Sequence, residues 1–219
     1  MRRFDLVIFD NDGVLVDSEP LANAALAEIL TGYGLAVDWH DCVERYLGNT
    51  LGRVRELVEA ELGRPIPADF EQHYRAVVYP RLAERVQPIA GVAGLLDALD
   101  AAGVPTCVAS SAIHERITIT LTTAGLIDRF EGDRRFSAED VGRGKPAPDL
   151  FLHAAAAMGA LPERCAVVED APAGIEAAAA AGMTSFGYAA LTPARLLAAA
   201  TGGLVVDMAD LPDLLLAPA

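Results

Sequence analysis

The sequence predicts an α/β fold, a Rossmann-like parallel sheet with helices on both faces and an inserted α-helical cap domain. Short apolar runs rich in β-branched residues alternate with alanine-rich segments of helical character over most of the chain. Such alternation is typical of a parallel sheet covered on both faces. Residues 18–87 break the alternation, because their apolar residues recur only at helical spacing. We therefore expect an α/β core domain of residues 1–17 and 88–219, and a helical cap domain of residues 18–87.

The expected strands are short apolar runs bounded by polar residues or glycine. Each run is three to six residues long, which suits a buried strand better than a helix. The five runs cover residues 6–9, 104–109, 165–168, 184–188 and 204–206.

The expected helices of the core domain lie between these strands. They cover residues 91–102, 113–124, 148–159, 172–181 and 193–200. Proline is favoured in the first turn of a helix and glycine just after the last. The start signals are Pro148, Pro172 and Thr192-Pro193, and the stop signals are Gly103, Gly125 and Gly182.

The cap domain is expected to contain helices only. Its last helix has apolar residues at helical spacing but also contains Pro80, which we expect to kink or interrupt it. Ligands of open parallel sheets bind outside the carboxyl ends of the strands, and this insertion follows the first strand. We therefore expect it to cover a ligand site, although an insertion that only adds stability is the alternative.

Composition narrows the class of partner and the compartment. A formal net charge of -14 disfavours nucleic acid and anionic membrane surfaces, which are themselves negative. Cys42, Cys107 and Cys165 are scattered and odd in number, so they indicate neither a disulfide framework nor a zinc site. The first residues do not resemble a signal peptide, and no apolar stretch is long enough to span a membrane. A cytoplasmic protein is expected, and its oligomeric state is left open.

Two aspartates directly follow the first expected strand. Asp10 and Asp12 are two residues apart, so on extended backbone their side chains point the same way, and Gly13 lets the chain turn away. Two carboxylates held together are unstable without a cation, and a divalent metal ion is the simplest one. The alternative is that Asp and Asn merely form a turn after a strand.

Three more polar segments are expected at the same edge of the sheet. Ser110 and Ser111 end the second strand, although serines there can simply cap a helix. Lys145 lies between glycine and proline before a helix, where a solvated loop lysine is the alternative. Glu169 and Asp170 end a later strand. Four carboxylates, a hydroxyl and a lysine together predict Mg²⁺ and a bound phosphate group.

Four motifs carry a family resemblance. FDNDGVLVDSEP, VASS, GKPAPDLF and VVEDAPAGIEAA occur in that order, with the helical insertion after the first. In this they resemble the haloacid dehalogenase superfamily, in the branch with a helical cap that includes β-phosphoglucomutase and phosphoglycolate phosphatase-like enzymes. The resemblance covers nearly the whole chain.

The resemblance implies a role for each motif residue. Asp10 is the expected nucleophile that forms an aspartyl-phosphate, and Asp12 the general acid and then base. The remaining implied roles are phosphate binding by Ser110, Ser111 and Lys145, and Mg²⁺ binding by Asp10, the Asp12 main-chain carbonyl and Asp170, supported by Glu169.

The resemblance also separates the activities of the superfamily. Dehalogenases lack an aspartate at the position of Asp12, and the phosphonate-cleaving branch needs a cap lysine that residues 18–87 do not contain. In the mutase, a cap histidine and a cap arginine assist turnover, and Ala22 and Leu51 stand at those places. Candidate substrate contacts in the cap are Glu19, Asn49 and Arg53. The alternatives are that Asn49 and Arg53 are ordinary helix-surface residues and that Glu19 simply caps the first helix of the insertion.

The expected function is Mg²⁺-dependent hydrolysis of a small phosphate ester, in particular a sugar or polyol phosphate. A phosphosugar mutase of the β-phosphoglucomutase type is the first alternative, because it shares every core residue. A non-catalytic binding module is the second, and it is disfavoured because none of the key acids or the lysine is missing.

Overall fold

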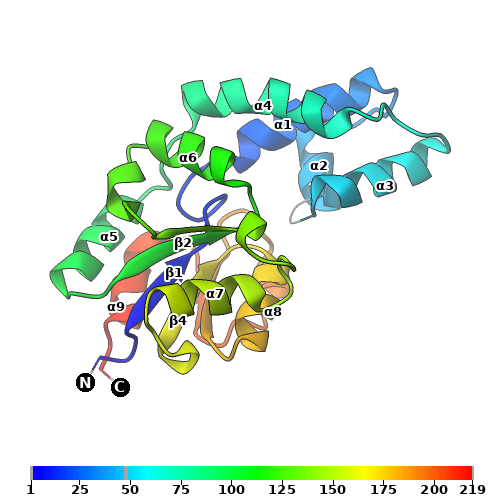
Figure 1. Cartoon of the computed structure of the whole chain (residues 1–219). Coiled ribbons are helices and arrows are strands. Elements are labelled where there is room, and N and C mark those ends of the chain that lie inside the picture. Colours follow the sequence, from blue (N-terminus) through cyan, green and yellow to red (C-terminus); the bar gives the residue numbers. More distant parts are fainter. Residues whose placement is uncertain (1, 47–48, 219) are drawn as a thin grey trace. The chain divides into compact units, whose positions relative to one another are not determined.

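The computed structural model describes residues 2–46 and 49–218, which form two compact units. The first, here called the core unit, comprises Met1–Asp17 and Gln87–Ala219. The second, the helical unit, is the insertion Ser18–Val86. Figure 1 shows that all strands of the described residues belong to the core unit.

The core unit is built on one six-stranded sheet, and all its described strand pairs are parallel. The strand order is β3-β2-β1-β4-β5-β6, so successive strands extend from β1 first to one side and then to the other. The bounds are β1 Leu6–Phe9, β2 Thr106–Ser110, β3 Arg135–Ser137, β4 Cys165–Glu169, β5 Thr184–Tyr188 and β6 Gly203–Val205. The order reverses between β1 and β4, and open sheets of this kind bind ligands at such a point.

Helices cover both faces of the sheet, as Figure 1 shows. One face packs against α7 and α8, whose residues form a hydrophobic core with alternate residues of β1, β2 and β4. On the other side α5 packs against α9. Every residue of β1, β2 and β4 is buried, as expected for strands covered on both faces. The bounds are α5 Val92–Ala101, α6 His114–Thr123, α7 Asp149–Ala157, α8 Pro172–Ala180 and α9 Leu211–Leu215.

The predicted fold class is confirmed, but three details of the core unit differ from expectation. The segment 193–200 was expected to be a helix, and only Ala194–Leu196 forms a short 3-10 helix, η4. Just after it, Ser185 and Thr201 exchange backbone-to-side-chain hydrogen bonds of 3.1 and 3.3 Å, which draw the chain to the edge of β5. This tertiary pairing outweighs the helix propensity of the alanines. β3 and α9, which have only three and five residues, were not expected from the sequence.

The helical unit consists of four helices in its described residues. They are α1 Glu19–Gly32, α2 Trp39–Tyr46, α3 Leu51–Leu62 and α4 Phe70–Arg85. Helix α1 packs against α2 and α4, and α4 also packs against α3. The expected all-helical character of this segment is therefore present in the structure.

We expected Pro80 to kink or interrupt the last cap helix. Helix α4 continues through Pro80, so the interruption is wrong. Proline at this position removes one backbone donor, which leaves the carbonyl of Ala76 without its usual partner. Pro80 and Ala76 are both exposed, so water can reach that carbonyl. The opposite face is anchored by Phe70, Tyr74, Val78 and Leu82, which are all buried. Burial of this apolar stripe offsets the cost of the proline.

No helix among the described residues is both long enough and apolar enough to cross a lipid bilayer.

The three cysteines are free and fully buried, which gives a first testable prediction. Burial raises the pKa of the Cys42 and Cys165 thiols to about 11 and that of Cys107 further still. The reactive thiolate is therefore scarce at pH 8 as well as inaccessible. We expect 5,5'-dithiobis(2-nitrobenzoate) to react with the native protein at least about 100-fold more slowly than with the protein unfolded in guanidinium. Rapid reaction of any native thiol would contradict this packing.

Candidate functional site

The candidate site lies at the carboxyl ends of β1 and β4, where the strand order reverses. The backbone N–H of Asp10, just after β1, donates to the carbonyl of Val168 in β4 at 3.0 Å. The chain then turns tightly, because the carbonyl of Asn11 accepts from Leu15 and Val16 at 3.0 and 3.1 Å. This hydrogen bonding holds Asp10 and Asp12 on one rigid turn.

Gly13 leaves room for the Asp170 carboxylate to lie against this turn. Gly13 has a φ of +79°, a conformation that other L-residues rarely adopt. A Cβ built on Gly13 would overlap the Oδ2 atom of Asp170. The space of the missing side chain is thus filled by a carboxylate from the end of β4. Asp170 therefore lies against the turn that carries Asp10 and Asp12.

Lys145 is the centre of the site. Its ammonium group donates to Asp10 Oδ1 at 2.6 Å, to Glu169 Oε1 at 2.6 Å and to the Ala109 carbonyl at 2.9 Å. These contacts join the ends of β1, β2 and β4 through one side chain, which is only 4% exposed. Lys145 is also the only lysine of the chain. The alternative of a solvated loop lysine is therefore wrong.

The electrostatics of the Lys145 contacts are those of a buried, acid-rich cluster. Burial raises the pKa of Asp10 to about 7; Lys145 opposes this shift and Glu169 adds to it. Burial alone would lower the pKa of Lys145, but Asp10 and Glu169 outweigh it and raise that pKa above its usual range. One ammonium group thus faces two carboxylates, while Asp12 lies on the same turn as Asp10 and Asp170 lies against that turn from the end of β4. The surplus of negative charge favours binding of a further cation.

Glu169 is held on both of its carboxylate oxygens by the protein. Oε1 accepts from Lys145, and Oε2 accepts from the Ala171 N–H at 2.9 Å. A Cβ on Gly174, in the first turn of α8, would overlap the Glu169 carboxylate, so this glycine makes room for it. Glu169 therefore supports Lys145. Its expected part at the metal ion stays a prediction.

The two serines end β2 beside the Lys145 contacts. Ser110 is buried, and its Oγ accepts from the Ala112 N–H at 3.1 Å. Ser111 is exposed. The contact to Ala112 is the local turn contact that serines often make, so phosphate binding by Ser110 and Ser111 stays a prediction.

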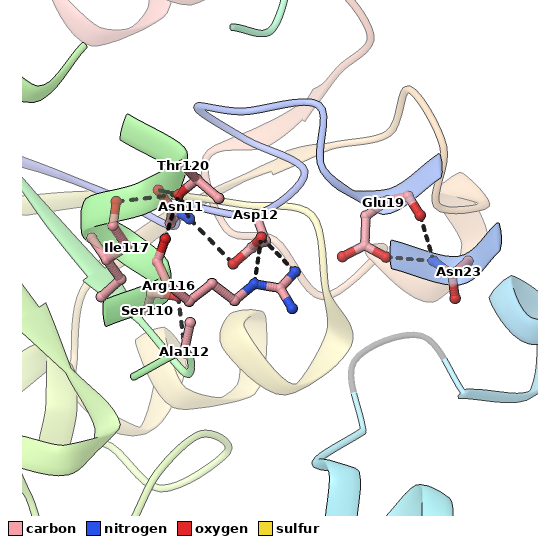
Figure 2. A network of polar contacts seen from close by, with 9 residues as sticks. All are labelled: Asn11, Asp12, Glu19, Asn23, Ser110, Ala112, Arg116, Ile117 and Thr120. Carbon is pink, nitrogen blue, oxygen red and sulfur yellow. Dashed lines mark hydrogen bonds and ion pairs between the residues drawn. The ribbon is translucent and has the colours of Figure 1, made fainter. Parts of the chain in front are cut away.

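Arg116 is the site residue that the sequence analysis missed. Its Nε and Nη2 atoms both donate to Asp12 Oδ1, at 3.1 and 2.7 Å, as Figure 2 shows. Arg116 lies in the first turn of α6, where the helix dipole disfavours a cation. An arginine in that unfavourable position, a few residues after the VASS motif, was the signal that could have found it.

The three candidate residues of the helical unit have partners within that unit. Glu19 Oε2 accepts from Asn23 at 2.7 Å, a contact drawn in Figure 2. Asn49 donates to the Tyr46 carbonyl through its backbone N–H at 3.0 Å and its side chain at 3.3 Å. Arg53 is 55% exposed and pairs with Glu56 at 2.6 Å. Glu19 and Arg53 are helix residues, whereas Asn49 lies outside the helices, so its expected place on a helix surface is wrong. Substrate contact stays a prediction for all three.

The donor set fits a magnesium ion bound largely through water. Among the described residues, no group of three or more His, Cys, Asp or Glu side chains is placed to hold a metal ion. Mg²⁺ commonly binds one or two carboxylates and keeps several water molecules, so it needs no such group. Asp170 lies against the turn that carries Asp10 and Asp12, and Asp10 and Asp170 are 8% and 7% exposed. Asp10, the Asp12 carbonyl and Asp170 are therefore suitable oxygen donors for Mg²⁺.

A family model for haloacid dehalogenase-like hydrolases matches residues 4–182. The chain belongs to this family. The family prediction made from the four motifs is thereby confirmed, and the match includes every motif residue named above. The matched range also includes the helical unit.

Characterised relatives cover most of the chain. It is 32% identical to the 6-phosphogluconate phosphatase of Escherichia coli K12, over 87% of this chain and 85% of the relative. It is also 32% identical to the fructose-1-phosphate phosphatase YqaB of the same organism, over 83% and 95% of the two chains. A crystal structure of a hydrolase of this family from Deinococcus radiodurans R1, with bound phosphate and sodium, has 33% identity and a TM-score of 0.80, and the match covers 100% of each chain.

Proposed function

We propose that this haloacid dehalogenase-like hydrolase is a Mg²⁺-dependent phosphatase. Its substrate is a small phosphorylated metabolite, a sugar or polyol phosphate. The observation that carries the proposal is the position of Lys145, which bridges Asp10 and Glu169 at the point where the strand order reverses. The named activities of the two Escherichia coli relatives support the same class of substrate.

In the proposed reaction Asp10 is the nucleophile. A carboxylate oxygen of Asp10 forms a bond to phosphorus in line with the ester oxygen, and the bond from phosphorus to that oxygen breaks. Asp12 gives a proton to the departing oxygen. Water then attacks the phosphorus of the aspartyl-phosphate while Asp12 takes its proton, and the bond to Asp10 breaks to release inorganic phosphate.

Lys145 reduces the repulsion between the attacking carboxylate and the phosphate group. A carboxylate that attacks a phosphate dianion is repelled by it, so positive charge must be in place beforehand. The ammonium group of Lys145 is fixed by three hydrogen bonds in a buried site and needs little reorganisation. Glu169 keeps the ammonium group in place. We propose that Lys145, Ser110 and Ser111 bind oxygens of the transferring phosphoryl group.

Mg²⁺, held by Asp10, the Asp12 carbonyl and Asp170, would supply further charge neutralisation on the phosphoryl oxygens. Because Asp170 occupies the space over Gly13, a larger residue at position 13 would push away one of these ligands. We also propose that the helical unit acts as a cap that selects the substrate, and that the protein is cytoplasmic, which its free cysteines support.

The test of the function is a panel of sugar, polyol and nucleoside phosphates assayed for release of inorganic phosphate. We expect release from sugar or polyol phosphates that needs Mg²⁺ and falls by at least about 100-fold in excess EDTA. Activity that EDTA leaves unchanged would contradict the metal dependence. Conversion of a hexose 1-phosphate to its 6-phosphate without net phosphate release would instead favour a mutase.

The single lysine offers a binding test that does not depend on turnover. Isotopic labelling of lysine gives one side-chain signal, that of Lys145, in nuclear magnetic resonance spectra. We expect inorganic phosphate added with Mg²⁺ to shift this signal, because the ammonium group gains a phosphate oxygen as a partner. A Lys145 signal that does not respond to phosphate at saturating concentration would exclude its proposed role.

A further inference from the structure

A buried network from α6 holds the carboxylate of Asp12 on both oxygens. Arg116 donates twice to Oδ1, at 3.1 and 2.7 Å, and the side chain of Asn11 donates to Oδ2 at 3.2 Å. The Arg116 and Asp12 side chains are each only 14% exposed. Figure 2 shows that the guanidinium group and the amide reach the carboxylate from different sides. The plane of the carboxylate is thereby fixed.

The donors are themselves fixed by Thr120, one turn beyond Arg116 on α6. Asn11 donates to Thr120 Oγ1 at 3.0 Å, and Thr120 donates to the Arg116 carbonyl at 3.0 Å. Asn11 and Thr120 are both fully buried. Buried, fully connected polar networks of this kind are rigid and orient the groups that they contain.

The start of α6 is held in place by a separate pair of acids. The His114 N–H donates to Glu139 at 2.9 Å, and the His114 ring nitrogen Nε2 lies 2.7 Å from Asp140. Both acids belong to the 3-10 helix η2, Ala138–Asp140. The turn of α6 that carries Arg116 is therefore anchored independently of Asp12, as a positioning element should be.

Helix stability does not explain an arginine at this place. Arg116 lies in the first turn of α6, where a cation opposes the helix dipole. Asp12 lies outside any long strand or helix, on the turn that carries the proposed nucleophile. The pair therefore constrains an acid that must meet both a departing oxygen and a water molecule.

We infer that Arg116, with Asn11, is a positioning residue for Asp12. This inference rests on the proposed phosphatase function. Proton transfer requires the acid to lie within hydrogen-bond reach of the reacting oxygen, so an Asp12 carboxylate free to rotate spends less time in a productive position. Arg116 acts on the rate of proton transfer through Asp12, and the reaction of Asp10 with phosphorus does not depend on it.

The first experiment compares two leaving groups in Arg116→Met and Arg116→Lys. The alkoxide of a sugar phosphate needs a proton as it leaves, whereas 4-nitrophenolate does not. We expect Arg116→Met to lower kcat/KM by about 10- to 100-fold for the best sugar phosphate of the panel, but less than about 3-fold for 4-nitrophenyl phosphate. Arg116→Lys keeps the positive charge but lacks the two parallel N–H donors of arginine. Its kcat/KM for the sugar phosphate should therefore lie between those of Arg116→Met and the wild type.

Arg129→Met is the matched control. Arg129 also pairs with acids of the core unit, Asp97 and Asp100, but it is not part of the site. Arg129→Met should leave kcat/KM unchanged for both the sugar phosphate and 4-nitrophenyl phosphate. Thermal unfolding of every variant checks that the fold is retained. Equal losses with both substrates in Arg116→Met would overturn the inference, because a structural or substrate-binding role affects both.

A double-mutant cycle with Asp12→Asn is the decisive test. If Arg116 acts only through Asp12, Arg116→Met in the Asp12→Asn background should change kcat/KM less than about 2-fold. Additive losses would refute the inference while the wild-type activity, and its loss in Asp10→Asn, still support the proposed function. Failure of the function itself would differ, because wild-type protein would then release no phosphate from any ester.

Discussion

Asp10→Asn should lower kcat/KM by about 10⁴-fold or more on every phosphate ester that the wild-type protein hydrolyses. The amide keeps the shape of the carboxylate but is a very poor nucleophile, so no aspartyl-phosphate forms. The measurement is phosphate release together with intact-protein mass spectrometry after rapid acid quenching. Wild-type protein should gain the mass of one phosphoryl group during turnover, and the variant should not.

The same substitution should leave the fold stable, which separates loss of chemistry from loss of structure. Burial raises the pKa of Asp10, so the site stabilises the charged carboxylate poorly. An amide oxygen can still accept from Lys145, whose bond to Glu169 is retained. We expect the free energy of unfolding to change by less than about 1 kcal/mol.

Asp97→Asn is the control for Asp10→Asn. Asp97 is 63% exposed and pairs with Arg129 in the core unit. Its replacement should alter neither turnover nor the mass change. Turnover by Asp10→Asn within 10-fold of the wild type would show that another group attacks phosphorus.

Lys145→Met should abolish activity and also destabilise the protein. The methionine retains the length of the side chain and its packing near Phe151, but Asp10 and Glu169 lose their shared cation. Removing one partner of a buried ion pair costs about 3–5 kcal/mol, because the remaining charge is buried without compensation. We expect a loss of this order in chemical denaturation and a fall in kcat/KM of at least about 10³-fold.

Two companions make the Lys145 prediction specific. Arg143→Met, in the same loop, removes an exposed pair with Asp149 and should have little effect on either quantity. Lys145→Met combined with Glu169→Gln removes one buried charge and should regain part of the stability, with no return of activity. Normal stability of Lys145→Met alone would mean that the two carboxylates do not depend on this lysine.

Motifs with a strong local signal could be predicted from the sequence. β1 and β5 have the expected limits, and the segments that carry Asp10, Lys145 and Asp170 meet at one sheet edge. These predictions succeeded because the strands of a parallel sheet all have their carboxyl ends at the same edge. Each of these predictions required only that a strand and the turn residue after it be recognised, and that the segments occur in a known order.

The failures lie where local propensity and tertiary contacts compete. The alanines of 193–200 favour a helix, yet the pairing of Ser185 with Thr201 holds the following chain against β5. β3 is too short to show any periodicity and exists because β2 offers it a partner. The place of Arg116 in the first turn of a helix is only a weak signal in the sequence, and the packing of α6 is what brings it to Asp12.

The sequence alone determined the fold class, the family resemblance and the segments that supply the site, because these depend on residue types in a fixed order along the chain. The tertiary structure decided which partner each charge has: Lys145 lies between Asp10 and Glu169, Glu169 also binds the backbone of Ala171, and Asp12 pairs with Arg116. Partner choice depends on distances of a few ångströms between segments far apart in sequence, and no local pattern of residues encodes such distances.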